Sequence, residues 1–182
     1  MNDYCAGIAY ATGCLVSENG NAPYLVVRNI DKFYPKTIAS ETGYKSYPVT
    51  IENRETQQWA VKVRNVHEIP CPSDVSDVHS FLRAYVEIHG VLDAMNCKKR
   101  NGEKIHRLRL RIYGNLDIIS YINDIIPVPP KSVQEVVTQT GRTYALYYQS
   151  KKEIFDILDW ISGEPCNVKI WNSWKSLIDS IC

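Results

Sequence analysis

The chain has 182 residues, of which 45% are hydrophobic and 23% charged, and its formal net charge is +1. This balance excludes an intrinsically disordered protein, and the length suffices for one sizeable core or two small ones. The apolar runs are too short to span a membrane, and the near-zero charge means that any attraction to nucleic acid must come from local basic clusters.

The cysteines and the N-terminus indicate a reducing compartment. Six cysteines occur without a CxxC pair, which favours free thiols. Cys71 with His67 or His79 offers only three ligands for zinc, so we predict no metal site. The N-terminus has an acidic Asp3 and no basic segment, which favours a helix of the fold over a signal peptide. We therefore expect a cytoplasmic protein, nucleoid-associated if it is bacterial or from a phage.

The first half of the chain predicts a helix, an extended segment, a second helix and a hairpin. The hairpin consists of two β-branched or aromatic runs around the polar turn "ENRETQ". In chain order these elements cover residues 3–12, 23–29, 31–40 and 47–66.

A proline-containing linker separates this half from a longer one. We assign residues 1–66 to the first half, 67–77 to the linker and 78–182 to the second half. The elements of the second half are predicted from helical spacing and strand alternation of apolar residues, and from Asp77 as the N-cap of the first helix. They are a helix at 78–89, strands at 91–97 and 105–113, a helix at 115–126, a hairpin at 134–149, and amphipathic helices at 151–161 and 172–181. We interpret the two halves as one repeated order of helix, strand, strand, helix, strand, strand, with a single extended segment assigned between the two helices of the first half.

Small residues in the two leading helices predict that these helices pack against each other. The first helix has more Gly and Ala than an exposed helix needs, and small side chains allow two backbones to approach closely. The predicted interface residues are Gly7, Gly13, Ala84 and Gly90.

Two segments in this layout, "CAGIAYATG" at 5–13 and "LRAYVEIHG" at 82–90, are similar to the motif of the LAGLIDADG homing endonucleases. The chain resembles the single-chain, pseudo-dimeric form of that family. The resemblance implies an α+β fold of two αββαββ-type repeats, with saddle-shaped antiparallel sheets over DNA and a central two-helix interface.

The resemblance also implies where a catalytic centre would lie. In the family, the penultimate residue of each motif is an acid that holds a divalent metal. Here these positions are Thr12 and His89. Threonine is neutral, and imidazole prefers zinc or copper to magnesium. We therefore predict a degenerate active site with no assignable catalytic residue and no cofactor, with magnesium only if nuclease activity survives through displaced ligands such as Glu18 or Asp93.

A strand in the second half carries the strongest binding signal. In "KIHRLRLRIY", alternation places Arg107, Arg109 and Arg111 on one face and apolar residues on the other. Three neighbouring guanidinium groups repel one another unless an anion is near. The other predicted DNA-binding residues are Lys98, Lys99, Arg100, Lys104, Arg28, Lys62, Arg64 and Arg142, whereas acidic residues concentrate in the predicted helices.

These features predict a monomeric, sequence-specific double-stranded DNA-binding protein that derives from a homing endonuclease, has lost cleavage, and acts as a regulator or accessory factor. Two alternatives remain open from the sequence. One is a metal-dependent DNA endonuclease with displaced ligands. The other is a protein-binding module, for example an inhibitor or modulator of an enzyme or polymerase.

Overall fold

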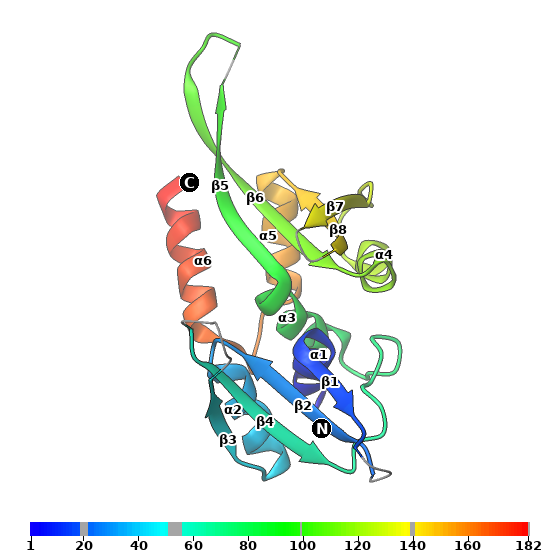
Figure 1. Cartoon of the computed structure of the whole chain (residues 1–182). Helices are drawn as coiled ribbons and strands as arrows, with labels where there is room; N and C mark the ends of the chain where they lie inside the picture. Colours follow the sequence, from blue (N-terminus) through cyan, green and yellow to red (C-terminus); the bar gives the residue numbers. More distant parts are fainter. Residues whose placement is uncertain (19–21, 51–55, 99, 139–140, 182) are drawn as a thin grey trace. The chain divides into compact units, whose positions relative to one another are not determined.

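The computed structural model describes all residues except 19–21, 51–55, 99, 139–140 and 182. The chain divides into two compact units, Met1–Ile88 and His89–Cys182 (Figure 1). Each unit contains one four-stranded antiparallel sheet.

In the described residues of the first unit, three helices accompany the sheet, whose strand order is β1-β2-β4-β3. Leu25 and Val27 of β2, together with Val61 and Val63 of β4, are buried on the helix side. The elements are α1 (Asp3–Thr12), β1 (Gly13–Val16), β2 (Tyr24–Asn29), α2 (Phe33–Thr42), β3 (Ser46–Val49), β4 (Gln58–Arg64) and α3 (Val78–His89), the last of which ends at the boundary between the units.

Helix α3 belongs by packing to the first unit, although by element order it begins the second repeat. A Cβ atom placed on Gly7 of α1 would lie 2.3 Å from the carbonyl oxygen of Phe81 and 3.0 Å from the Cβ atom of Ala84. Such closeness is possible only for glycine. The compact units therefore divide at 88/89, whereas the sequence repeat divides at the linker.

Polar contacts at the helix starts hold α1 and α3 together. The predicted Asp77 cap accepts hydrogen bonds from the Ser80 backbone N–H at 3.1 Å and the Ser80 hydroxyl at 2.6 Å. These bonds lower the pKa of Asp77. Asp3 of α1 accepts from the backbone N–H groups of Ser76 and Asp77 at 3.1 and 2.6 Å. The linker end is thereby fixed to the first helix.

The second unit repeats the topology of the first. Its sheet has the strand order β5-β6-β8-β7, which corresponds strand for strand to β1-β2-β4-β3. This confirms the internal duplication predicted from the element order. The elements are β5 (Gly90–Lys98), β6 (Lys104–Gly114), α4 (Leu116–Ile125), β7 (Gln134–Thr138), β8 (Gly141–Tyr148), α5 (Lys151–Trp160) and α6 (Val168–Ile181).

The core of the second unit lies on one side of its sheet. Leu110 and Ile112 of β6 are fully buried, as are Leu146 of β8 and Ile154 and Ile157 of α5. Figure 1 shows that the β5–β6 hairpin extends beyond the other two strands of the sheet. In its distal part Asn96, Lys98, Lys104 and His106 are exposed, whereas the facing pair Cys97 and Ile105 is half-buried.

Two elements differ clearly from the sequence predictions. The short strand β1 was not expected, because its four residues directly follow a helix and show no clear alternation. The last helix begins at Val168 rather than at 172. Within the described residues, no helix is both long enough and apolar enough to cross a membrane.

Candidate nucleic-acid interface

The outward face of the second sheet carries the three arginines predicted from alternation. Leu108 and Leu110 point to the core, so Arg107, Arg109 and Arg111 lie on the opposite face. Arg107 is exposed, and the side chains of Arg109 and Arg111 are 25% and 22% exposed. These arginines are therefore not covered by the helices.

Asp93 of β5 lies on the same face, directly opposite Arg109 in the strand register. Arg109 donates from Nε to Oδ1 of Asp93 at 3.0 Å and from Nη2 to Oδ2 at 2.9 Å. Arg111 donates from Nη2 to the same Oδ2. One carboxylate thus binds two guanidinium groups, and sequence alternation alone did not predict this because the pairing depends on register across a hairpin.

The charges and rings around Asp93 reinforce this arrangement. The hydrogen bond from Arg109 is the main cause that lowers the pKa of Asp93, and the same bond raises the pKa of Arg109. Arg111 also donates from Nη1 to the Tyr113 hydroxyl at 2.9 Å, and its guanidinium lies 5.8 Å from that ring's centroid. Burial and the nearby Tyr113 raise the pKa of Tyr147, which neighbours Arg111 in register. The result is an ordered polar cluster on the sheet face.

The first sheet also has an outward basic face. Arg28 of β2 and Lys62 and Arg64 of β4 are exposed and share one side of the sheet. The Lys62 ammonium lies 5.2 Å from the centroid of the Tyr24 ring. The register partners of the three basic residues are Ala60, Val26 and Tyr24, none of which is acidic.

The remaining predicted basic residues lie at the ends of hairpins. Lys98, Arg100 and Lys104 are exposed at the tip of the β5–β6 hairpin, and Lys99 lies outside the described residues. Arg142 of β8 has the strand parity of the buried Leu146, so its side chain starts from the helix side of the sheet, and its Nε atom lies 3.2 Å from Oε1 of Glu135. The structure thus places Arg142 apart from the three arginines of β6.

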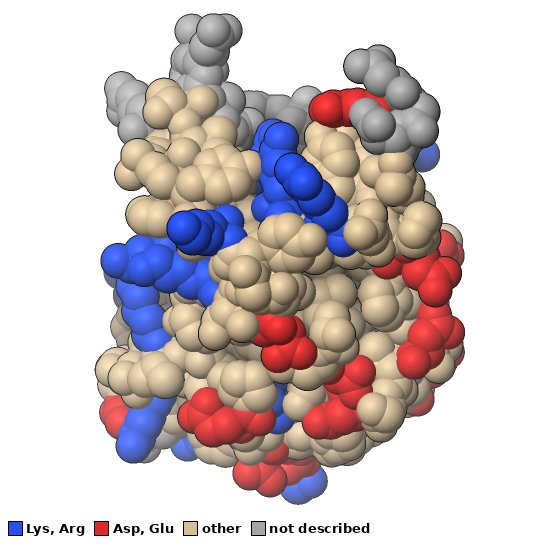
Figure 2. All heavy atoms as spheres, turned by 90° about the horizontal axis from the view of Figure 1, so that it is seen from below, with Lys and Arg blue, Asp and Glu red and all other residues tan. Residues whose placement is uncertain are grey.

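Figure 2 shows that Lys and Arg side chains lie next to one another in local patches on this surface, and that Asp and Glu form other patches. A near-zero net charge is therefore compatible with local basic surfaces.

Neither motif position that would carry a catalytic acid has one. Thr12 is half-buried, and its hydroxyl donates to the Ile8 carbonyl 3.4 Å away, within α1. His89, also half-buried, is the last residue of α3. The acid two residues before it, Glu87, is 4% exposed and accepts a hydrogen bond from the Tyr4 hydroxyl at 2.5 Å. Glu87 thus joins α3 to α1.

The four predicted helix-interface residues have two different roles. Gly7 and Ala84 come together where α1 meets α3. Gly13 and Gly90 are instead the first residues of β1 and β5. A Cβ atom on Gly13 would lie 2.4 Å from the Ala9 carbonyl oxygen and 2.8 Å from the Leu25 side chain. The glycine that ends each motif thus marks the turn from helix to strand.

Two acids could supply displaced metal ligands, and both have protein partners. Glu18 accepts from the Tyr24 hydroxyl at 2.7 Å, and Asp93 is bound by two arginines. In the part of the chain that the structure describes, no three His, Cys, Asp or Glu side chains are grouped as metal ligands would be. The five cysteines described are free, and burial raises the pKa of the Cys5 thiol to about 12.

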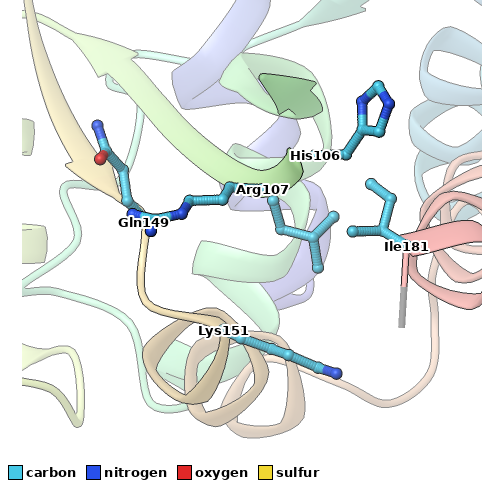
Figure 3. A pocket seen from close by; sticks show the side chains of 6 residues that line it. His106, Arg107, Gln149, Lys151 and Ile181 are labelled. Carbon is cyan, nitrogen blue, oxygen red and sulfur yellow. The ribbon is translucent and has the colours of Figure 1, made fainter. Parts of the chain in front are cut away.

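A pocket of about 250 Å³ lies between β6 and the last two helices, with Leu108 and Ile181 in its lining. Figure 3 shows that Arg107 points toward Gln149, whereas His106 and Lys151 point in other directions. The basic groups at this pocket diverge and do not converge on a common anion.

Comparison with solved structures identifies the fold. A point mutant of I-SmaMI superposes with a TM-score of 0.69 at 8% sequence identity, covering 98% of this chain and 90% of that chain. The I-LtrWI LAGLIDADG homing endonuclease bound to target DNA gives 0.65 at 12% identity, covering 98% and 89%. The meganuclease I-SmaMI bound to uncleaveable DNA gives 0.67 at 8% identity, covering 98% and 88%.

These comparisons and the two repeated sheets confirm the predicted α+β fold, which is that of the LAGLIDADG homing endonucleases. No protein-family model and no curated protein matches the sequence. The likeness therefore concerns the fold, and any activity has to be argued from the residues of this chain.

Proposed function

We propose that this chain is a monomer that binds double-stranded DNA at a specific sequence, has lost cleavage, and acts as a regulator or accessory factor. The observation that carries the proposal is the outward face of the second sheet. Three arginines lie there in one strand while the alternate residues fill the core. A two-stranded ribbon fits the major groove, where arginine recognises guanine edges and nearby phosphates.

Two further observations support DNA as the ligand. The first sheet has a second exposed basic face, formed by Arg28, Lys62 and Arg64. The similar structures include homing endonucleases described as bound to DNA. Because phosphate contacts supply most of the affinity in such complexes, two basic sheet faces on one chain favour a nucleic-acid ligand over a protein ligand.

The loss of cleavage is supported by the residues at the motif ends. Metal-assisted phosphodiester hydrolysis needs oxygen ligands that carry negative charge. Thr12 provides a neutral hydroxyl and His89 an imidazole. The oxygens of Asp93, the nearest alternative on β5, accept hydrogen bonds from Arg109 and Arg111.

A selection of bound duplexes from a random pool tests the binding. We expect enrichment of one sequence, and affinity for that sequence should fall with salt at a log–log slope of about −0.9 per phosphate contacted. Arg107→Glu should weaken binding, whereas Lys169→Glu on α6 serves as a matched charge reversal away from the sheet face. No enrichment, together with salt-independent binding to a protein, would favour the protein-binding module instead.

Incubation of a supercoiled plasmid that carries the selected site with Mg²⁺ or Mn²⁺ tests the loss of cleavage. We expect the plasmid to remain supercoiled. Nicking that disappears in Glu18→Gln or Asp93→Asn would contradict the proposal and establish an endonuclease with displaced ligands.

A further inference from the structure

We infer that Asp93 determines DNA-sequence specificity by positioning Arg109 and Arg111. It holds Arg109 so that this side chain meets a base edge in one orientation instead of moving freely among phosphates, and Arg111 keeps the carboxylate in place. This inference rests on the proposed function, because it concerns how the same sheet face selects its DNA.

The contacts of Arg109 leave it one edge for a ligand. A guanidinium group has five N–H donors in a rigid plane. Nε and one hydrogen of Nη2 are used by the two oxygens of Asp93. The other hydrogen of Nη2 and those of Nη1 remain, which is the edge that binds the O6 and N7 atoms of guanine in a bidentate manner. A planar group fixed along one edge can present the other edge in only a narrow range of directions.

The contacts of Arg111 are different. Its Nη2 atom donates to Asp93 and its Nη1 atom to the Tyr113 hydroxyl. Its Nε atom is buried and has no hydrogen-bond partner within the described part of the chain. Arg111 therefore acts as a positioning residue. Its hydrogen bond to the carboxylate helps to keep Asp93, and with it Arg109, in place.

The charge on Asp93 also disfavours indiscriminate binding. Two guanidinium groups with one carboxylate carry a net charge of +1 instead of +2, and the carboxylate repels phosphate at short range. Arg107, one position further along the same face, has Met95 as its register partner and is exposed. Its charge is therefore available to a phosphate. The strand thus combines one exposed cation with two that are bound to a carboxylate.

Asp93→Asn tests this inference with almost no change in shape. Dissociation constants are measured for the selected duplex and for a scrambled duplex at several salt concentrations. We expect the variant to bind scrambled DNA more tightly, with a salt slope steeper by about 1 to 2, because both arginines become available to phosphates. The preference for the selected duplex should fall roughly tenfold, the discrimination expected from one bidentate base contact. Asp124→Asn on α4 is the control for loss of a negative charge elsewhere.

Arg109→Lys provides a second test that does not depend on Asp93 tolerating substitution. Lysine keeps the charge but lacks the planar fork. Binding to scrambled DNA should therefore stay within about twofold, while the preference for the selected duplex falls roughly tenfold.

The results separate the two proposals. A preference that stays unchanged in both variants would overturn the role of Asp93 and leave DNA binding intact. Equal weakening on both duplexes in Arg109→Lys would also overturn it, since Arg109 would then act only as a charge. If the unaltered protein prefers no duplex over another, the proposed function fails, and the inference fails with it.

Discussion

The outward faces of the two sheets share a topology and differ in how they hold their basic side chains. In the first sheet, Arg28, Lys62 and Arg64 are exposed, and their register partners are not acidic. In the second, Arg109 and Arg111 are bound to Asp93 between them. The first face presents positive charge, whereas the second also fixes the direction of its donors.

The difference follows from the chemistry of the partners. A carboxylate binds a guanidinium group along one edge and sets its plane. An aromatic ring, such as that of Tyr24 near Lys62, attracts an ammonium group without fixing the direction of its hydrogens. We therefore expect the second sheet to supply most of the sequence discrimination and both sheets to supply affinity.

The largest expected effect contrasts Arg109→Glu with Lys62→Glu. Glutamate at 109 would face Asp93 directly and remove a held donor, so affinity for the selected duplex should fall about 100-fold or more. Glutamate at 62 alters an exposed charge, and the expected loss is about tenfold. Fluorescence anisotropy at fixed salt measures both. If both variants lose similar affinity for the selected duplex, the two sheets do not differ in how they contribute to binding.

Removing one exposed arginine should weaken DNA binding less than these charge reversals, and by the same factor in either sheet. Arg28→Ala and Arg107→Ala each remove one exposed cation, so each should lower the salt slope by about 0.9 and weaken binding about fivefold at physiological salt. Selected and scrambled duplexes should be affected alike. A loss confined to the selected duplex would mean that these residues read bases.

The next effect concerns stability and pH. The pKa of Asp93 is lowered, mainly by the hydrogen bond from Arg109, so its contribution is present above the ordinary aspartate pKa of about 3.9 and is lost as the pH falls through the lower folded value. At pH 7, Asp93→Asn should reduce the free energy of unfolding by about 1 kcal/mol, and the difference from the unaltered protein should vanish in strong acid. Urea unfolding between pH 2 and 7 measures it.

Lys62→Gln is the matched variant in the first sheet. The named partner of Lys62 is the Tyr24 ring. The hydrogen bond from the Tyr24 hydroxyl to Glu18 raises the pKa of this phenol further above its ordinary value of about 10, so the ring is uncharged throughout the range from pH 2 to 7. The effect of Lys62→Gln on the free energy of unfolding should therefore not change between pH 2 and 7. A pH-dependent difference at position 62 would show that an acidic group holds this lysine as well.

The smallest effect is expected for Arg142→Ala. Arg142 starts from the helix side of its strand, and its charge is paired with Glu135. Affinity should change less than about twofold, since an exposed pair of this kind contributes little. A loss comparable to that of Arg107→Ala would place Arg142 in the DNA contact after all.

The sequence predicted the helices and the faces of the strands because these depend on local periodicity. Alternation along β6 was enough to separate Arg109 from Leu110, and the Asp77 cap marked the start of α3. Strand β1 was missed, because four residues after a helix give little pattern.

The side-chain contacts that hold the arginines and the two leading helices in place join residues that are far apart in the sequence. Asp93 and Arg109 are 16 residues apart, and only the register of the β5–β6 hairpin brings them together. The contact of Glu87 with Tyr4 likewise depends on how α3 packs against α1. Sequence reasoning noted Asp93 as a candidate metal ligand, and in the structure its carboxylate accepts hydrogen bonds from two arginines.

The most direct test is to run the random-pool selection in parallel on the unaltered protein and on Asp93→Asn. We predict that the unaltered protein enriches one sequence, and that the variant loses preference at a few adjacent base pairs while it keeps the rest. Identical enriched sequences from the two proteins would contradict the claim that Arg109, held by Asp93, reads DNA.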